Sequence, residues 1–269
     1  TYHPGTYPRV HPRGTRKGDY RWRLSALDRA MMAGCDDVGL GALFGLHDWR
    51  FELLSLLQHN AHLEEAFGVG CHTISVPRME PAENAPLAAT PPAKVSDEDF
   101  KKLIAILRVA VPYTGIILST RESAAMRREC YDLGVSQISA GSRTNPGGYT
   151  AAADATAQFQ LGDHRSLEEI VRDLATMGYI PSFCTACYRL GRTGKDFMDL
   201  AKPGLIKRKC DPNAVTTFLE YLTDYACEET RAAGEIAIEA GLGKMDDKVR
   251  SNAERLLKNI RLGKRDVFC

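Results

Sequence analysis

The protein has 269 residues, of which 44% are apolar and 26% are charged, as in an ordinary soluble globular protein. Its formal net charge of +1 gives no electrostatic reason to expect nucleic acid or a membrane surface as a partner. No apolar run reaches the roughly 20 residues that a membrane-spanning helix needs. We therefore expect a cytoplasmic protein, whose eight cysteines are metal ligands or buried side chains rather than disulfides.

Short β-rich runs alternate with amphipathic helices in the first part of the chain. The strand candidates, in chain order, are Asp37–Leu46, His72–Met79, Gly115–Arg121, Gln137–Arg143, Gln158–Gly162 and Pro181–Thr185. Apolar residues at helical spacing predict helices between them, with two faces made by Phe100, Leu103, Ile104 and Leu107 and by Leu167, Ile170, Val171, Leu174 and Met177. This alternation predicts an α/β fold with parallel strands, either a doubly wound sheet or much of a (β/α) barrel.

The alternation stops after about residue 183, and the pattern then becomes helical. One helix is indicated by an apolar face of Val215, Phe218, Leu219 and Leu222, and another is expected from Met245 to Ile260. We place a domain boundary near residue 180. Residues 1–180 are then an α/β domain, and residues 181–269 a helical domain that carries a cysteine motif.

Cys184 and Cys187 form a CxxC pair, and Cys210 follows after a basic loop. Positive charge near a thiol favours the thiolate that binds metal. Three thiolates suit an iron–sulfur cluster and would leave one iron of a cubane without a protein ligand. From spacing alone, two other interpretations remain open: a non-catalytic module with a structural Cys3His zinc site, or a CxxC pair with Cys210 unrelated.

The segment CTACYRLGRTGKDFMDLAKPGLIKRKC resembles the FeFe-hydrogenase maturase family of tyrosine-cleaving radical-SAM enzymes, and so do GALFGLHDWRFE, GVGCHTISVPR, YTGIILSTRE and GVSQISAGSRTNPGGY. The 2-iminoacetate synthases of the thiazole pathway are similar through the barrel but lack the CxxC…C element, which favours the maturases. The resemblance implies that residues 1–180 are the C-terminal part of a radical-SAM (β/α) barrel of the TIM type. Residues 181–269 would be a helical appendage with an auxiliary 4Fe–4S cluster on Cys184, Cys187 and Cys210.

The resemblance also implies an activity. Such a lyase uses S-adenosylmethionine and a second 4Fe–4S cluster to cleave tyrosine into p-cresol and dehydroglycine. The dehydroglycine becomes carbon monoxide and cyanide on the auxiliary cluster, whose extra iron leaves with a free cysteine for hydrogenase assembly by other maturases. The CxxxCxxC motif that holds the second cluster is absent among the eight cysteines. We therefore expect a chain that lacks about half of the enzyme and is inactive alone.

Four residues are candidate substrate contacts because they close predicted strands, where barrel enzymes bind substrate. The guanidinium of Arg121 can donate two parallel hydrogen bonds to a carboxylate, an arrangement called a fork below. The resemblance points to Ser119 and Arg121 as the tyrosine carboxylate contacts. Arg78 and Arg143 are weaker candidates for substrate or S-adenosylmethionine. The alternative for Arg121 is a structural ion pair with Glu122 or Asp132.

One histidine is a candidate ligand of the extra iron. The resemblance assigns this role best to His62, with His72 as the alternative because it opens a strand at the same end of the barrel. Without the resemblance, His62 is more easily explained as a surface or helix-capping residue.

Overall fold

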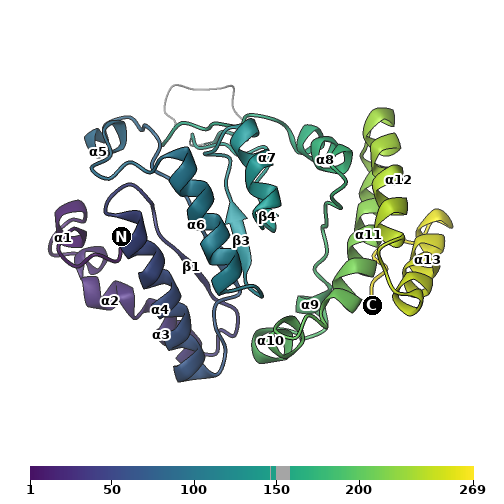
Figure 1. Ribbon diagram of the computed structural model, residues 1–269, viewed down its shortest axis with the longest axis horizontal. Helices are drawn as coiled ribbons and strands as arrows, with labels where there is room; N and C mark the ends of the chain where they lie inside the picture. The colour runs from purple at the N-terminus through teal and green to yellow at the C-terminus, as the bar shows by residue number, and fades with distance from the viewer. Residues whose placement is uncertain (146, 150–157) are drawn as a thin grey trace. The chain divides into compact units, whose positions relative to one another are not determined.

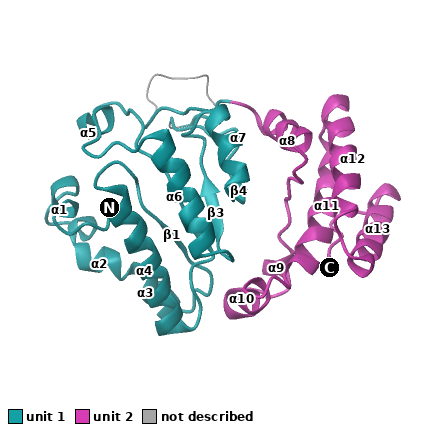
Figure 2. Ribbon diagram, in the orientation of Figure 1, with its two compact units in different colours: residues 1–164 teal, residues 165–269 magenta. Residues whose placement is uncertain are grey.

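The computed structural model describes residues 1–145, 147–149 and 158–269. The chain forms two compact units, residues 1–164 and residues 165–269 (Figure 2). None of the described helices is both long enough and apolar enough to cross a bilayer.

A parallel sheet runs through the first unit (Figure 1). Its strands pair in chain order and are β1 (Gly39–Gly41), β2 (Thr73–Ser75), β3 (Gly115–Leu118) and β4 (Gln137–Ile138). In the register, Ile74 lies opposite Leu40 on one side and Ile116 on the other, and all three are buried. The predicted α/β class with parallel strands is thus confirmed.

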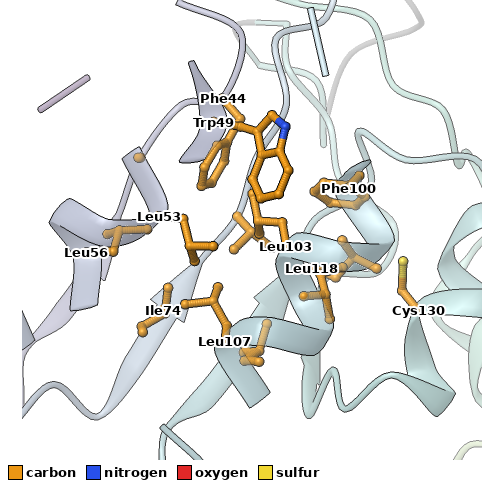
Figure 3. Close-up of a cluster of buried hydrophobic side chains, with 14 of the residues drawn as sticks. Phe44, Trp49, Leu53, Leu56, Ile74, Phe100, Leu103, Leu107, Leu118 and Cys130 are labelled. Carbon is orange, nitrogen blue, oxygen red and sulfur yellow. The ribbon is translucent and has the colours of Figure 1, made fainter. Parts of the chain in front are cut away.

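Helices follow the first three strands in turn and pack beside one another: α4 (Trp49–Phe67), α6 (Asp97–Ala110) and α7 (Ala124–Asp132). Figure 3 shows the core between the sheet and these helices, where Phe44, Ile74 and Leu118 from the sheet side meet Leu56 and Phe100. The predicted face of α6 is confirmed, since its four apolar residues are fully buried. Short helices complete the unit: α1 (Tyr7–Val10), η1 (Arg16–Gly18), α2 (Tyr20–Leu24), α3 (Ala26–Met32) and α5 (Pro86–Ala89).

Two of the six strand candidates are not strands. In the segment 158–162, backbone N–H groups bind loop carbonyls instead of a neighbouring strand: Gln160 donates to Pro81 at 2.9 Å and Gly162 to Thr120 at 2.9 Å. In the segment 181–185, the N–H of Phe183 donates to the hydroxyl of Thr217 on a helix. Both segments have strand-like composition, but their hydrogen-bonding groups are used elsewhere.

The second unit is helical throughout its regular structure. It contains α8 (Leu167–Thr176), α9 (Ala186–Arg189), α10 (Gly194–Ala201), α11 (Lys207–Asp224), α12 (Glu228–Leu242) and α13 (Asp247–Arg261). Helix α11 contacts both α12 and α13, and the predicted apolar face of α11 lies in their shared core. The helix expected from Met245 to Ile260 corresponds to α13.

The units divide between residues 164 and 165, earlier in the chain than the boundary near residue 180 expected from the sequence. The reason is α8, which contacts α12 and places Val171 and Ala175 in the core of the second unit. A polar contact adds to this packing, because Glu168 accepts the backbone N–H of Cys227 at 2.7 Å. Helix α8 therefore belongs with the helical unit rather than with the sheet.

Candidate functional site

The first candidate site lies where β3 ends, in the turn that leads to α7. Ser119 and Arg121 are both half-buried there, and the backbone N–H of Arg121 donates to Ser119 Oγ at 3.3 Å. Because that oxygen accepts from the backbone, the hydroxyl proton of Ser119 remains able to donate to a bound ligand. Helix α7 follows this turn, and Ser123 caps its N-terminus by accepting the backbone N–H of Met126 on its side-chain oxygen.

The Arg121 guanidinium stacks on an aromatic ring. Its central carbon lies 3.5 Å from the centre of the Phe159 ring. Burial lowers the pKa of Arg121, whereas the charges of Glu80 and Glu122 act in the opposite direction. Among the residues that the structure describes, no carboxylate lies within ion-pair distance of Arg121. The structural pairing considered for Arg121, with Glu122 or Asp132, is therefore not what these residues form.

Glu122 instead pairs with Arg78. The Arg78 Nε donates to Glu122 Oε1 at 2.9 Å, a second contact joins Nη2 to Oε2, and Nη1 donates to Asp97 at 2.7 Å. Glu122 is only 3% exposed, so this bidentate pair links the ends of β2 and β3 inside the protein. The structure thus gives Arg78 a structural partner, which weakens it as a candidate substrate contact.

Arg143 is exposed, and its backbone N–H donates to the Tyr149 hydroxyl oxygen at 3.3 Å. Within the described ranges, no contact joins Arg143 to Ser119 or Arg121. Its role as a substrate contact stays a prediction.

The second candidate site is the cysteine motif in the second unit. Cys184 and Cys187 flank the start of α9, where the N–H of Ala186 donates to Cys184 Sγ at 3.4 Å. Cys210 lies in the first turn of α11, whose N-terminus carries a positive partial charge. The short helix α10 and its flanking turns connect α9 to α11, and the chain folds back so that Cys210 approaches the CxxC pair.

The thiols of Cys184 and Cys187 lie close enough to affect the ionisation of Cys210. The pKa of the Cys210 thiol is raised to about 11, first by desolvation and then by the nearby thiols of Cys187 and Cys184. As a residue Cys210 is exposed, so the desolvation comes from protein atoms packed near its thiol. Arg192 is the cation that opposes the shift, and it also fixes the motif by donating its N–H to the carbonyl of Cys187 at 2.9 Å. Positive charge in the loop was expected to favour the thiolate, but the net shift of the Cys210 pKa is upward, and the cation that opposes it is Arg192 rather than a lysine of the loop.

No group of three or more Cys, His, Asp or Glu side chains stands ready to hold a metal ion in the part of the chain that the structure describes. The donor types still suit an iron–sulfur cluster, because the motif offers three thiols and those of Cys187 and Cys184 lie near enough to raise the pKa of Cys210.

The residues after α13 return to this motif. Asn213, one turn along α11 from Cys210 and 1% exposed, holds the backbone of Cys269 on both sides: its Oδ1 accepts the N–H at 2.8 Å and its Nδ2 donates to the carbonyl at 3.1 Å. Arg192 Nη2 donates to the same carbonyl at 3.0 Å. Neither contact was expected from the sequence, because a single asparagine in a helix gives no signal of a long-range partner.

His62 is exposed on α4 in the first unit, and its Nε2 lies 2.6 Å from Asp28. The alternative, His72, is half-buried with its Nδ1 3.6 Å from Asp37. Each histidine therefore has a carboxylate neighbour, an arrangement that orients imidazole ligands in many metal sites. Their role as iron ligands stays a prediction.

Comparisons with known proteins give similarity along the whole chain. Residues 75–180 match the family model of the Biotin and Thiamin Synthesis associated domain. The 2-iminoacetate synthase of Escherichia coli is 34% identical over 197 residues, which are 72% of this chain and 51% of that protein. The enzyme of the same name from Salmonella typhimurium is 34% identical over 183 residues, 67% of this chain and 47% of that protein.

Two solved structures are similar over nearly all residues. A crystal structure of HydG, described as a maturase of the FeFe-hydrogenase, is 52% identical with a TM-score of 0.94, covering 100% of this chain and 58% of that one. HydG from Carboxydothermus hydrogenoformans is 43% identical with a TM-score of 0.78, covering 96% of this chain and 55% of that one. The chain thus spans about half the length of the relatives that it matches.

Proposed function

We propose that this chain, which belongs to the family of HydG and 2-iminoacetate synthase, is the part of a radical-SAM tyrosine lyase that binds the tyrosine carboxylate and carries an auxiliary iron–sulfur cluster. The lyase would cleave tyrosine to p-cresol and dehydroglycine and serve FeFe-hydrogenase assembly, together with other maturases. The observation that carries this proposal is the joint presence of an arginine stacked on an aromatic ring at a strand end and a three-cysteine motif, in a chain similar to HydG throughout.

The substrate end of the proposal is Arg121 with Ser119. A guanidinium fork binds both oxygens of a carboxylate, and the Ser119 hydroxyl is free to donate to the same group. These two side chains would fix the amino-acid end of tyrosine. The radical that breaks the Cα–Cβ bond would be supplied by S-adenosylmethionine and its 4Fe–4S cluster, as the resemblance to this family implies.

The second part of the proposal is the cysteine motif. Cys184, Cys187 and Cys210 would hold the auxiliary 4Fe–4S cluster, which supplies iron sites for turning dehydroglycine into carbon monoxide and cyanide. Three protein thiolates leave room for other ligands on the cluster. Arg192 and Asn213 would keep the motif and the neighbouring backbone of Cys269 in place.

His62 is proposed as a ligand of the extra iron that leaves with free cysteine. Its Nε2 contacts Asp28, so Nδ1 is the nitrogen that could bind metal while the carboxylate keeps the ring oriented. His62→Ala should then lower the iron content of the reconstituted enzyme by about one iron per chain. Unchanged iron in this variant, with a loss in His72→Ala, would move the assignment to His72.

A single substitution separates the two parts of the function. In the full-length enzyme that contains this chain, Cys187→Ser should still release p-cresol from tyrosine, because Arg121 and Ser119 are untouched, but should yield no carbon monoxide or cyanide. Cys227→Ser is the matched control, since Cys227 is exposed and its neighbours are Thr230 and Arg172 rather than the motif. If Cys187→Ser still produced both diatomic products, the assignment of the auxiliary cluster would be wrong.

A further inference from the structure

The segment 158–163 lies across the turn that carries Arg121. Both the N–H of Gly162 and the N–H of Asp163 donate to the carbonyl of Thr120, at 2.9 and 3.1 Å. Thr120 stands between Ser119 and Arg121 and is 2% exposed. The peptide that joins the two proposed carboxylate contacts is therefore held by two hydrogen bonds from this segment.

Gly162 shows how close the approach is. A Cβ added at this residue would lie 2.5 Å from the carbonyl oxygen of Arg121 and 2.7 Å from the carbonyl carbon of Glu122. These distances leave no space for a side chain, so glycine is what allows the two backbones to touch. The 158–163 segment and the Arg121 turn consequently behave as one packed unit.

A buried ion pair fixes the end of the segment. Asp163 contacts the Arg127 guanidinium, and the two side chains are 1% and 0% exposed. Arg127 comes from α7 and also donates Nη2 to the carbonyl of Ser139, just after β4, at 2.5 Å. Because a buried charged pair is costly to break, it anchors the segment to both α7 and the sheet.

Phe159 is anchored separately on its backbone. Thr144 donates its hydroxyl to the carbonyl of Phe159 at 2.9 Å and accepts the N–H of Gln158 on its own carbonyl at 3.1 Å. The half-buried Phe159 ring is thereby held under the Arg121 guanidinium, at 3.5 Å. A cation–π contact at that distance restrains the guanidinium without hydrogen-bonding to its N–H donors, which stay available to a ligand.

We propose that Phe159 is a positioning residue, which holds Arg121 so that its fork meets the carboxylate of the substrate. The inference rests on the tyrosine-lyase function proposed above and assigns a residue to it that carries no chemistry of its own. Pairing with an aromatic ring suits this task better than pairing with a carboxylate. A carboxylate on Arg121 would compete with the substrate for the same donors, whereas a ring orients the fork without occupying it.

The test uses the full-length enzyme and compares p-cresol formation at varied tyrosine. Phe159→Leu keeps apolar volume but removes the ring, so the KM for tyrosine should rise about three- to tenfold with kcat little changed, the range expected for a desolvated cation–π contact. Phe159→Tyr keeps the ring and should restore the KM. Trp22→Leu is a matched control: it breaks a comparable stack, with Arg29 at 3.6 Å, and should leave the KM unchanged.

A second probe makes the readout specific for the carboxylate. Tyramine has the amine and phenol of tyrosine but no carboxylate, so its inhibition constant should be the same in wild type and Phe159→Leu. Neither KM nor an inhibition constant depends on the folded fraction, so a partly unfolded variant remains informative. An unchanged tyrosine KM, or an equal rise in the tyramine constant, overturns the positioning role. A wild-type enzyme that makes no p-cresol overturns the lyase function instead.

Discussion

Single residues differ in how far the sequence reveals their roles. Ser119 and Arg121 were placed correctly at the end of β3 because a strand with a clear apolar pattern precedes them. Arg78 and Arg121 both follow a predicted strand in the sequence. In the structure, Glu122 pairs with Arg78, whereas Arg121 stacks on Phe159. That choice depends on side-chain directions that no local pattern encodes.

Arg121→Lys tests the fork directly. A lysine keeps the positive charge but makes a single-point contact, so the KM for tyrosine should rise roughly tenfold or more. The measurement is the initial rate of p-cresol formation by the full-length enzyme at increasing tyrosine.

Arg78→Lys is the comparison for this substitution, because it also replaces a strand-end arginine. It should mainly lower the free energy of unfolding, since Glu122 is buried and loses a bidentate partner. If Arg78→Lys raised the tyrosine KM more than Arg121→Lys did, the two roles would have to be exchanged.

At the scale of elements, helices were predicted better than short extended segments. Helices α6 and α11 bury the faces that their spacing indicated. In α8, however, only part of the predicted face is buried: Ile170 and Val171 are buried, whereas Leu167 and Met177 are exposed. The segments 158–162 and 181–185 have the composition of strands, but whether a strand forms depends on a pairing partner elsewhere in the chain. Helix α8 was predicted as a helix but assigned to the first unit, whereas it packs in the second. An apolar helix face indicates burial but not the core in which the helix is buried.

The assignment of α8 leads to a prediction about the helical unit. A polypeptide of residues 165–269 should unfold cooperatively, whereas residues 181–269 should be much less stable, because removing α8 uncovers the part of the core that receives Val171 and Ala175. Circular dichroism during urea unfolding measures both. Equal midpoints for the two polypeptides would contradict the observed boundary.

At the scale of the whole molecule, the sequence supplied the α/β class, the helical second unit and the family, because many ordered segments agree with one another. It did not supply the contacts that hold each site in place. Asn213 hydrogen-bonds to the backbone of Cys269, and Asp163 pairs with Arg127. In both cases the two partners are far apart in the sequence. Such partners are set by tertiary packing, so the sequence could nominate candidate site residues but could not show which contacts hold them in place.

The most direct test is anaerobic loading of this chain with iron and sulfide, followed by measurement of bound iron, sulfide and zinc. We predict about four cluster irons per chain together with the extra iron proposed for His62, with broad absorption near roughly 400 nm. The cluster should be lost in Cys184→Ser, Cys187→Ser and Cys210→Ser and kept in Cys227→Ser. A colourless protein holding one zinc and no iron would contradict the account.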